Sequence, residues 1–247
     1  MKEMFESPEM VSIPGSSFVM GDLWNEGLPD ERPTYTVSLK SFKLAKFAVT
    51  NHQYLTFLND VGKREDDQRH LVVSLKKRHK PFGILPGSDG FTCAPEFENL
   101  PVTYVSWFGA NMFCEWLSKK SGIAFRLPTE EEWQCAAMGS RRLKFSLGND
   151  FNAEHYVIGR ERPESVDVGP PSELGLFNMT GNVFEWCSSE YTFCFDSCKA
   201  NNVLKGSRTI KGAAFVFSDS SNFRNSARFS CPEVSCLNCI GFRVAAS

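Results

Sequence analysis

Nine cysteines are the residues of this sequence with the most obvious chemistry. Thiols form disulfides, bind zinc or copper, and act as nucleophiles. Nine in 247 residues are too few for a disulfide-built domain, and the odd number leaves at least one thiol unpaired within the chain. Cys236-Leu-Asn-Cys239 is a CxxC pair without a second pair at zinc-finger spacing, and His70 and His79 lie far from it. The sequence therefore does not indicate structural zinc.

The segment 213–240 is unusual in its mixture of aromatic, thiol and small polar residues. Phe215, Phe217, Phe223 and Phe229 follow neither a helical nor a strand period. Two interpretations stay open at this point. The segment is an irregular loop that packs its rings against the body, or it is a surface whose apolar content marks a binding patch.

Composition limits the classes of protein. A hydrophobic fraction of 42% supports a core, and we expect one domain over residues 1–247. A net charge of −2 lacks the clustered positive charge of proteins that bind nucleic acid, so we expect no such partner. The sequence has no apolar run of about 18 residues, and its first twenty residues lack a basic segment followed by an apolar one. We expect no membrane span and no export signal.

Local signals predict two main helices and a shorter third one. Thr50 or Asn51 caps a helix that Gly62 ends, and Ser106 caps a helix that Gly122 ends. A capping box at Thr129 and Glu132 starts the third, which ends at Gly139. We expect ordered loop for most of 139–208 and strands at Met10 to Met20, Thr34 to Leu39, Lys43 to Val49, Thr209 to Val216 and Ile240 to Ala245.

Seven motifs occur in an order typical of one family. The sequence resembles the formylglycine-generating enzymes, or sulfatase-modifying factors, from end to end. This resemblance implies an α+β fold, a loop-rich variant of the C-type lectin fold with two main helices and a small twisted antiparallel sheet. The motifs are Met10-Val-Ser-Ile-Pro-Gly15 with Phe18-Val-Met-Gly21, Val49-Thr-Asn51, Pro101-Val-Thr-Tyr-Val-Ser-Trp107, Arg126-Leu-Pro-Thr-Glu-Glu-Glu-Trp133, Gly175-Leu-Phe-Asn-Met-Thr-Gly-Asn-Val-Phe-Glu-Trp186 and Gly241-Phe-Arg243.

The resemblance also implies where catalysis would occur. Enzymes of the family bind copper through two cysteines that follow an Arg-Gly-Gly-Ser stretch, which corresponds here to Lys211-Gly-Ala-Ala214. Phe217 takes the place of the first cysteine, and a residue near Asn222 takes the place of the second. Neither side chain is the soft ligand that copper(I) requires. We therefore expect no copper and no enzyme activity, with a copper-dependent oxidase of the formylglycine-generating type as the alternative.

Glu, Lys, Gln, Met and Trp are almost absent from 213–240, where Glu233 is the only one of them. No codon ending in C encodes these five residues. Their depletion, the closing Ile240-Gly-Phe-Arg243 and the frame Arg224-Asn-Ser-Ala-Arg228 resemble the hypervariable region of ligand-binding proteins diversified by retroelements, such as the treponemal variable proteins. The resemblance implies a non-catalytic protein that displays diverse ligand-binding residues at 213–240.

We expect the variable positions to point outward and the arginines of the frame to hold the loop. The outward set is Phe215, Phe217, Asp219, Phe223, Asn225, Phe229, Cys231, Val234, Ser235, Cys236 and Cys239. A protein or a cell-surface molecule is the expected partner, and the cell surface or extracellular space is the expected location.

Asn178-Met-Thr-Gly-Asn-Val-Phe-Glu185 resembles the calcium loop of the family. By this resemblance Asn178 and Glu185 bind the ion through their side chains, and Gly181 and Val183 through their carbonyls. Such oxygens suit Ca²⁺ better than Mg²⁺, although Mg²⁺ is possible. In the alternative interpretation, Asn182 and Glu185 only hydrogen-bond to loop amides.

Overall fold

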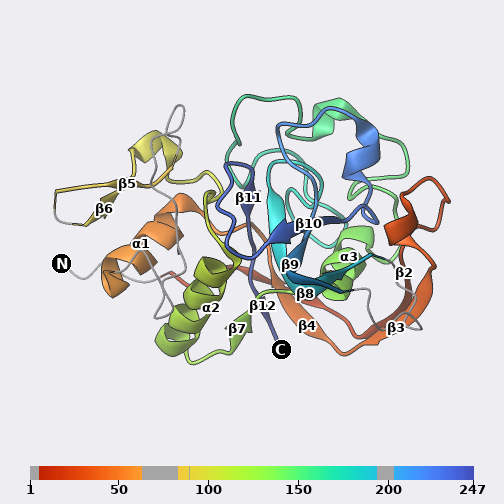
Figure 1. The fold of residues 1–247 in the computed structure, drawn as a ribbon, viewed down its shortest axis with the longest axis horizontal. Coiled ribbons are helices and arrows are strands. Elements are labelled where there is room, and N and C mark those ends of the chain that lie inside the picture. The colour runs from red at the N-terminus through yellow and green to blue at the C-terminus, as the bar shows by residue number, and fades with distance from the viewer. Residues whose placement is uncertain (1–5, 63–82, 89, 194–202) are drawn as a thin grey trace.

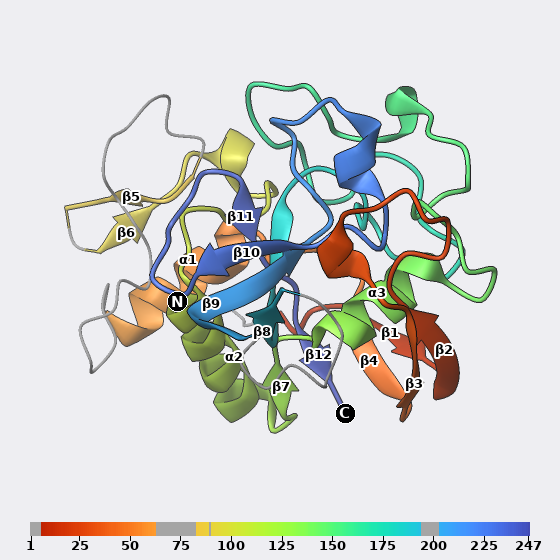
Figure 2. The same ribbon diagram turned by 45° about the vertical axis from the view of Figure 1, so that its right-hand side comes forward.

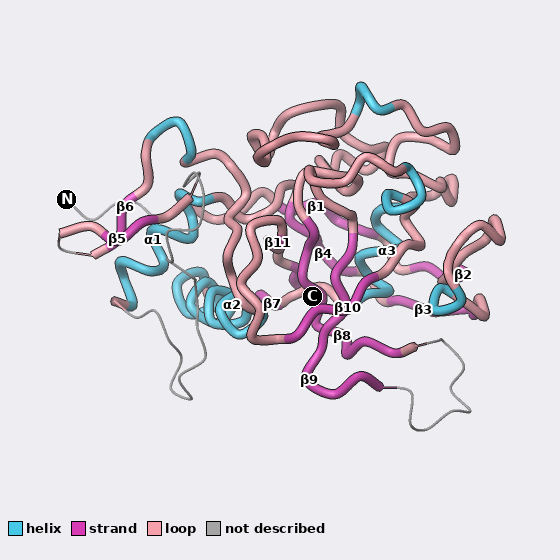
Figure 3. Tube along the Cα trace, turned by 45° about the horizontal axis from the view of Figure 1, so that its top comes forward, coloured by secondary structure: helices cyan, strands magenta, loops and turns pink. Residues whose placement is uncertain are grey.

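The computed structural model describes residues 6–62, 83–88, 90–193 and 203–247; His70, His79, Cys194 and Cys198 fall outside these ranges. It is a mixed α+β structure in which helices lie on both sides of central strands (Figure 1). Helices α1 (Asn51–Val61) and α2 (Trp107–Ser121) lie on one side, and α3 (Glu130–Met138) lies on the other. Loops cover much of the remaining surface (Figure 3).

The three helices begin and end where the sequence predicts. The hydroxyl groups of Thr50, Ser106 and Thr129 each accept a hydrogen bond from an amide in the first turn. Gly62 and Gly122 adopt the left-handed conformation that ends α1 and α2. None of the helices in the described ranges is long and apolar enough to cross a membrane.

Two four-stranded sheets form the centre. One has the order β1 (Met10–Ile13), β4 (Phe42–Ala45), β12 (Ala245–Ala246) and β7 (Phe125–Arg126). The other has the order β10 (Phe229–Pro232), β9 (Val203–Lys211), β8 (Phe184–Thr192) and β11 (Ile240–Gly241). The second sheet is mixed, because β11 pairs with β8 in parallel. The prediction of a purely antiparallel sheet is therefore wrong for this sheet.

Two ribbons lie outside these sheets. β2 (Ser16–Met20) pairs with β3 (Tyr35–Leu39), seen at the right in Figure 2, and β5 (Leu85–Pro86) pairs with β6 (Phe91–Thr92). Short 3-10 turns are η1 (Pro29–Glu31), η2 (Pro95–Phe97), η3 (Ala153–His155) and η4 (Ser220–Phe223).

Several predicted strands are shorter or shifted. Pro14-Gly15 divides the predicted first strand, and the strand predicted at Lys43 to Val49 ends at Ala45. The strand expected at Thr209 to Val216 instead runs from Val203 to Lys211, because Gly212 and Ala213 have positive φ and turn the chain out of the sheet. β8 lies in the region predicted to be loop, since its Phe-Glu-Trp-Cys start is buried on both faces and does not alternate.

The core is rich in aromatic rings. Tyr54 of α1 and Phe113 of α2 stack with ring centroids 5.6 Å apart, and both make edge contacts with Phe242. Trp133 and Trp186 are fully buried. This packing fixes the C-terminal strands against both helices, which positions residues 213–240 on a rigid body.

Candidate ligand-binding face and metal loop

Four residues of the predicted outward set are buried, so that part of the prediction is wrong. Phe215 packs with Leu100 and Val157, and the ring of Phe223 lies 5.6 Å from that of Phe151. Segments distant in the sequence supply these partners, which no local periodicity reveals. The two rings are therefore core residues.

Asn225 and Cys231 are the other two buried positions. Asn225 Nδ2 donates to the carbonyls of Ala137 and Leu143 at 3.1 and 2.9 Å, so its amide closes the end of α3 against the following turn. Cys231 lies on β10 and turns inward, where it joins the core cluster. Its thiol contributes to packing and not to the surface.

The remaining members of the set lie on two accessible stretches, 216–222 and 229–239, which we call the C-terminal face. Asp219 and Val234 are exposed, whereas Phe217, Phe229, Ser235, Cys236 and Cys239 are half-buried. Val216 and Leu237 are also exposed, at 47% and 46%, and were not predicted.

Phe217 is part of an aromatic cluster at the predicted copper position. Its ring makes an edge contact with Phe184 at 5.6 Å, and Phe184 makes another with Phe229 at 5.1 Å. Phe184 itself is 4% exposed, so it forms the floor between the two half-buried rings. An apolar cluster of this kind offers no ligand to copper.

Two thiols, those of Cys231 and Cys239, lie near this cluster. Burial, with a smaller effect of nearby Cys231, raises the pKa of the Cys239 thiol to about 11, and burial also raises the pKa of Cys231. Both thiols are therefore less readily deprotonated than an exposed cysteine thiol. Within the described ranges, no group of three or more His, Cys, Asp or Glu side chains is arranged to hold a metal ion.

Backbone hydrogen bonds fix the second stretch of the face. The amides of Tyr104 and Trp107 donate to the carbonyls of Leu237 and Glu233 at 2.8 and 3.1 Å. Glu233 also accepts a 2.7 Å bond from Arg208, whose guanidinium lies 4.1 Å from the ring of Trp107. The charge of Glu233 is thus paired, and the loop presents Val234 and Leu237 from a fixed support.

The frame between the two stretches is buried. Residues 223–228 are all inaccessible, and Arg224 and Arg228 form ion pairs with Glu31 and Glu130. As expected, these arginines hold the segment. The face is therefore two accessible stretches on either side of a buried anchor.

The predicted metal loop has positive φ at Asn178, Gly181 and Asn182. Both carboxylate oxygens of Glu185, however, accept hydrogen bonds from Arg243, and one of them also accepts a hydrogen bond from the indole N–H of Trp133. Its charge is neutralised inside the protein, so Glu185 does not fit the role of charged ligand. The other ligands that the resemblance implies are neutral oxygens, namely the side-chain oxygen of Asn178 and the carbonyls of Gly181 and Val183.

Asn182 behaves as the alternative interpretation predicts. Its side chain donates to the carbonyl of Glu164 and accepts from the amide of Glu164, both at 3.1 Å. These bonds tie the loop to residues 164–166, where the Val166 carbonyl also accepts from Asn178 Nδ2 at 3.0 Å. Hydrogen bonds therefore supply part of the order of this loop.

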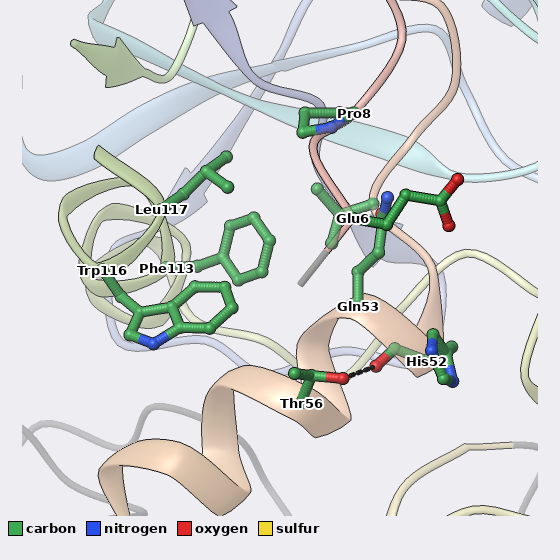
Figure 4. A pocket seen from close by; sticks show the side chains of 9 residues that line it. Glu6, Pro8, His52, Gln53, Thr56, Phe113, Trp116 and Leu117 are labelled. Atoms are coloured by element: carbon green, nitrogen blue, oxygen red, sulfur yellow. Dashed lines mark hydrogen bonds between the residues drawn. The ribbon is translucent and has the colours of Figure 1, made fainter. Parts of the chain in front are cut away.

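A separate pocket lies between α1, α2 and the N-terminal segment (Figure 4). Phe113, Trp116 and Leu117 form its apolar wall, and Thr56 donates to the carbonyl of His52 at 3.0 Å opposite them. It contains none of the predicted site residues, and its wall belongs to the helix-packing core.

The fold and the motifs that it brings together define a class, a domain of the formylglycine-generating-enzyme-like kind. The chain belongs to the sulfatase-modifying factor enzyme 1-like domain family, which it matches over residues 1–247.

Its relatives include both enzymes and a protein described as inactive. It is 34% identical to the serine/threonine-protein kinase pkn1 of Chlamydia pneumoniae over 76% of this chain and 28% of the kinase, so it spans less than a third of that relative. It is 28% identical to the formylglycine-generating enzyme of Streptomyces coelicolor, covering 95% of this chain and 88% of the enzyme. It is 26% identical to the mouse inactive C-alpha-formylglycine-generating enzyme 2, covering 98% and 87%.

Two solved structures share the fold. PvdO from Pseudomonas aeruginosa superposes with a TM-score of 0.77 at 23% identity, covering 97% of this chain and 94% of PvdO. Treponema denticola variable protein 1 superposes with a TM-score of 0.70 at 19% identity, covering 96% and 94%. At these identities the likeness shows the fold alone.

Proposed function

We propose that this chain is a non-catalytic ligand-binding domain that uses its C-terminal face on a C-type lectin-like scaffold. The observation that carries the proposal is the ring of Phe217, packed at 5.6 Å on Phe184 in the position of the first copper ligand. A face without thiolates, on loops fixed by buried ion pairs, is suited to binding through preorganised contacts. Val216, Val234 and Leu237 would supply apolar anchors among small polar residues.

The proposal includes diversification by a retroelement and display at the cell surface or outside the cell, with a protein or surface molecule as partner. The residue composition of 213–240 and the shared fold of Treponema denticola variable protein 1 support the first part. The buried frame at 223–228 also supports it, since changes at exposed positions such as Asp219 and Val234 would leave the contacts of this frame in place. A calcium ion held by neutral oxygens of Asn178, Gly181 and Val183 belongs to the same proposal.

The alternative is a copper-dependent oxidase, favoured by the similarity to the Streptomyces enzyme over nearly the whole chain. A copper(I) competition titration with a colorimetric chelator separates the two. We expect the wild-type protein to take no copper from the chelator, whereas the double variant Phe217→Cys with Asn222→Cys should gain affinity because it restores two soft ligands. Stoichiometric copper binding by the wild type would contradict the proposal.

A further inference from the structure

The loop of residues 22–31 lies beside the C-terminal face, although Glu31 and Arg224, which join them, are 193 positions apart in the sequence. Figure 2 shows η1 of this loop next to η4 of the face. We infer that Glu31 is a positioning residue of the face, which fixes the stretch 216–222 through Arg224. This inference rests on the proposed function, because it assigns Glu31 a role in the binding face. Its test, however, needs no ligand.

The contact between Glu31 and Arg224 is a two-point ion pair. Arg224 Nη1 donates to Glu31 Oε2 at 2.7 Å, and Nη2 donates to Oε1 at 2.9 Å. The two side chains are only 2% and 5% exposed, so water does not compete for these bonds. A bidentate pair of this kind fixes the orientation of the guanidinium as well as its position.

The loop 22–31 is built around this pair. Glu31 Oε1 also accepts the Leu28 amide at 2.9 Å, and the Asp22 carboxylate accepts the amides of Trp24 and Gly27 at 3.0 and 2.6 Å. A Cβ on Gly27 would lie 2.6 Å from Arg224 Nη1 and even closer to the Glu31 carboxylate. The loop therefore packs its backbone directly on the ion pair, and Glu31 has no room to turn away.

Arg224 transmits this constraint to the first stretch of the face. Its Nε donates to the carbonyl of Ser221 at 3.1 Å, within η4. Ser221 in turn donates its amide to the Asp219 side chain at 2.9 Å, and Asn222 donates its amide to the Asp219 carbonyl at 3.2 Å. Three hydrogen-bonded steps thus connect Glu31 to the exposed residue Asp219.

The second stretch is anchored mainly by the side chain of Glu130, with one further bond to the loop 22–31 at the Asp30 carbonyl. Arg228 Nε and Nη2 donate to the two oxygens of Glu130, both at 2.7 Å, and Nη1 donates to the carbonyls of Asp30 and Thr192. The turn after β10 is also held by the bonds to Tyr104 and Trp107 described above. Loss of Glu31 should therefore loosen 216–222 while 229–239 keeps its support.

Hydrogen exchange of the intact protein, read by NMR or by overlapping peptides in mass spectrometry, tests this inference without any ligand. In Glu31→Gln, we expect the amides of Ser221 and Asn222 to exchange about tenfold faster, because loss of a buried charged partner shifts a local opening equilibrium by roughly that factor. The amides of Glu233 and Ser235 should exchange at the wild-type rate. Glu31→Asp keeps the charge and should give an intermediate rate.

Glu173→Gln is a control for the loss of another ion pair, because Glu173 pairs with Arg141 at 2.6 Å in a more exposed position. It should leave the exchange of 216–222 unchanged. A uniform increase over both stretches in Glu31→Gln, or no increase at all, would overturn the inference. If Glu31→Gln does not fold, the wild-type rate in Glu31→Asp would overturn it in the same way. An increase in exchange rate confined to 216–222 would support the positioning role of Glu31 even if the face bound no ligand. The positioning role and the ligand-binding function can therefore fail independently.

Discussion

Arg243 and Glu185 form a fully buried ion pair that joins the last strands to the predicted metal loop. Arg243 Nε and Nη2 contact the two carboxylate oxygens at 2.7 Å each, and Trp133 Nε1 donates to the same carboxylate at 2.7 Å. The remaining donors of Arg243 bind carbonyls of Ala45, Lys46 and Phe177. One guanidinium therefore connects β4, the loop before Asn178, and β8.

Breaking this pair should be strongly destabilising. Glu185→Gln or Arg243→Met leaves one buried charge without its partner, which costs about 3–5 kcal/mol of unfolding free energy. Urea denaturation followed by tryptophan fluorescence measures this loss. In the double variant the cost should be smaller than the sum of the single costs, because neither charge is then left unpaired. Strict additivity would mean that the two side chains do not interact.

The proposed calcium ion should stabilise the protein by binding the side-chain oxygen of Asn178, without a contribution from the carboxylate of Glu185. An ion at about 100 times its dissociation constant adds about 2.7 kcal/mol, so a chelator should lower the melting temperature of the wild type. Asn178→Ala should melt at the same temperature with and without chelator. Equal melting temperatures for the wild type under both conditions would show that hydrogen bonds alone hold the loop.

Replacing buried and exposed apolar residues of the segment 213–240 should give different results. Phe223→Ser removes a core ring and should cost about 3–5 kcal/mol, as large-to-small core changes do. Val234→Ser should stay within about 0.5 kcal/mol, because this side chain is 58% exposed. Thermal melting of the two variants measures the contrast. A large loss for Val234→Ser would mean that its side chain packs against the body.

Acid should weaken the anchor between Glu130 and Arg228. Burial alone would raise the pKa of the Glu130 carboxyl, but Arg228 and Lys211 outweigh it and hold this pKa below its ordinary value. A carboxyl with a lowered folded-state pKa contributes stability above its unfolded pKa of about 4.3 and loses it as the pH falls through the folded value.

Unfolding free energies measured between neutral pH and acid should therefore fall below about pH 4.3 in the wild type. Glu130→Gln should be less stable at neutral pH and should show a shallower decline in acid. Parallel curves for the two proteins would contradict the assignment of this pH dependence to Glu130.

The sequence was sufficient for features that depend on neighbouring residues. The caps at Thr50, Ser106 and Thr129 gave the helix boundaries, because each cap bonds within its own turn. It was insufficient where a residue is buried by distant segments. Phe223 meets Phe151, and Asn225 meets the end of α3, contacts that an irregular segment does not encode locally.

Buried charges caused the other errors. Glu185 and Lys211 lie in the central strands β8 and β9, yet charged residues in a sequence indicate solvent exposure. Their partners, Arg243 for Glu185 and Glu130 for Lys211, lie 58 and 81 positions away along the chain. The strand β8 and the neutralised carboxylate of the metal loop were therefore visible only in the structure.

Aerobic incubation with copper and a cysteine-containing sulfatase-type peptide tests the central claim most directly. Mass spectrometry of the peptide reports conversion of its cysteine to formylglycine, and an active formylglycine-generating enzyme provides the positive control. Because Phe217 and Asn222 give copper no soft ligand, we expect the peptide mass to remain unchanged. Formation of formylglycine by the purified wild-type protein would contradict the account.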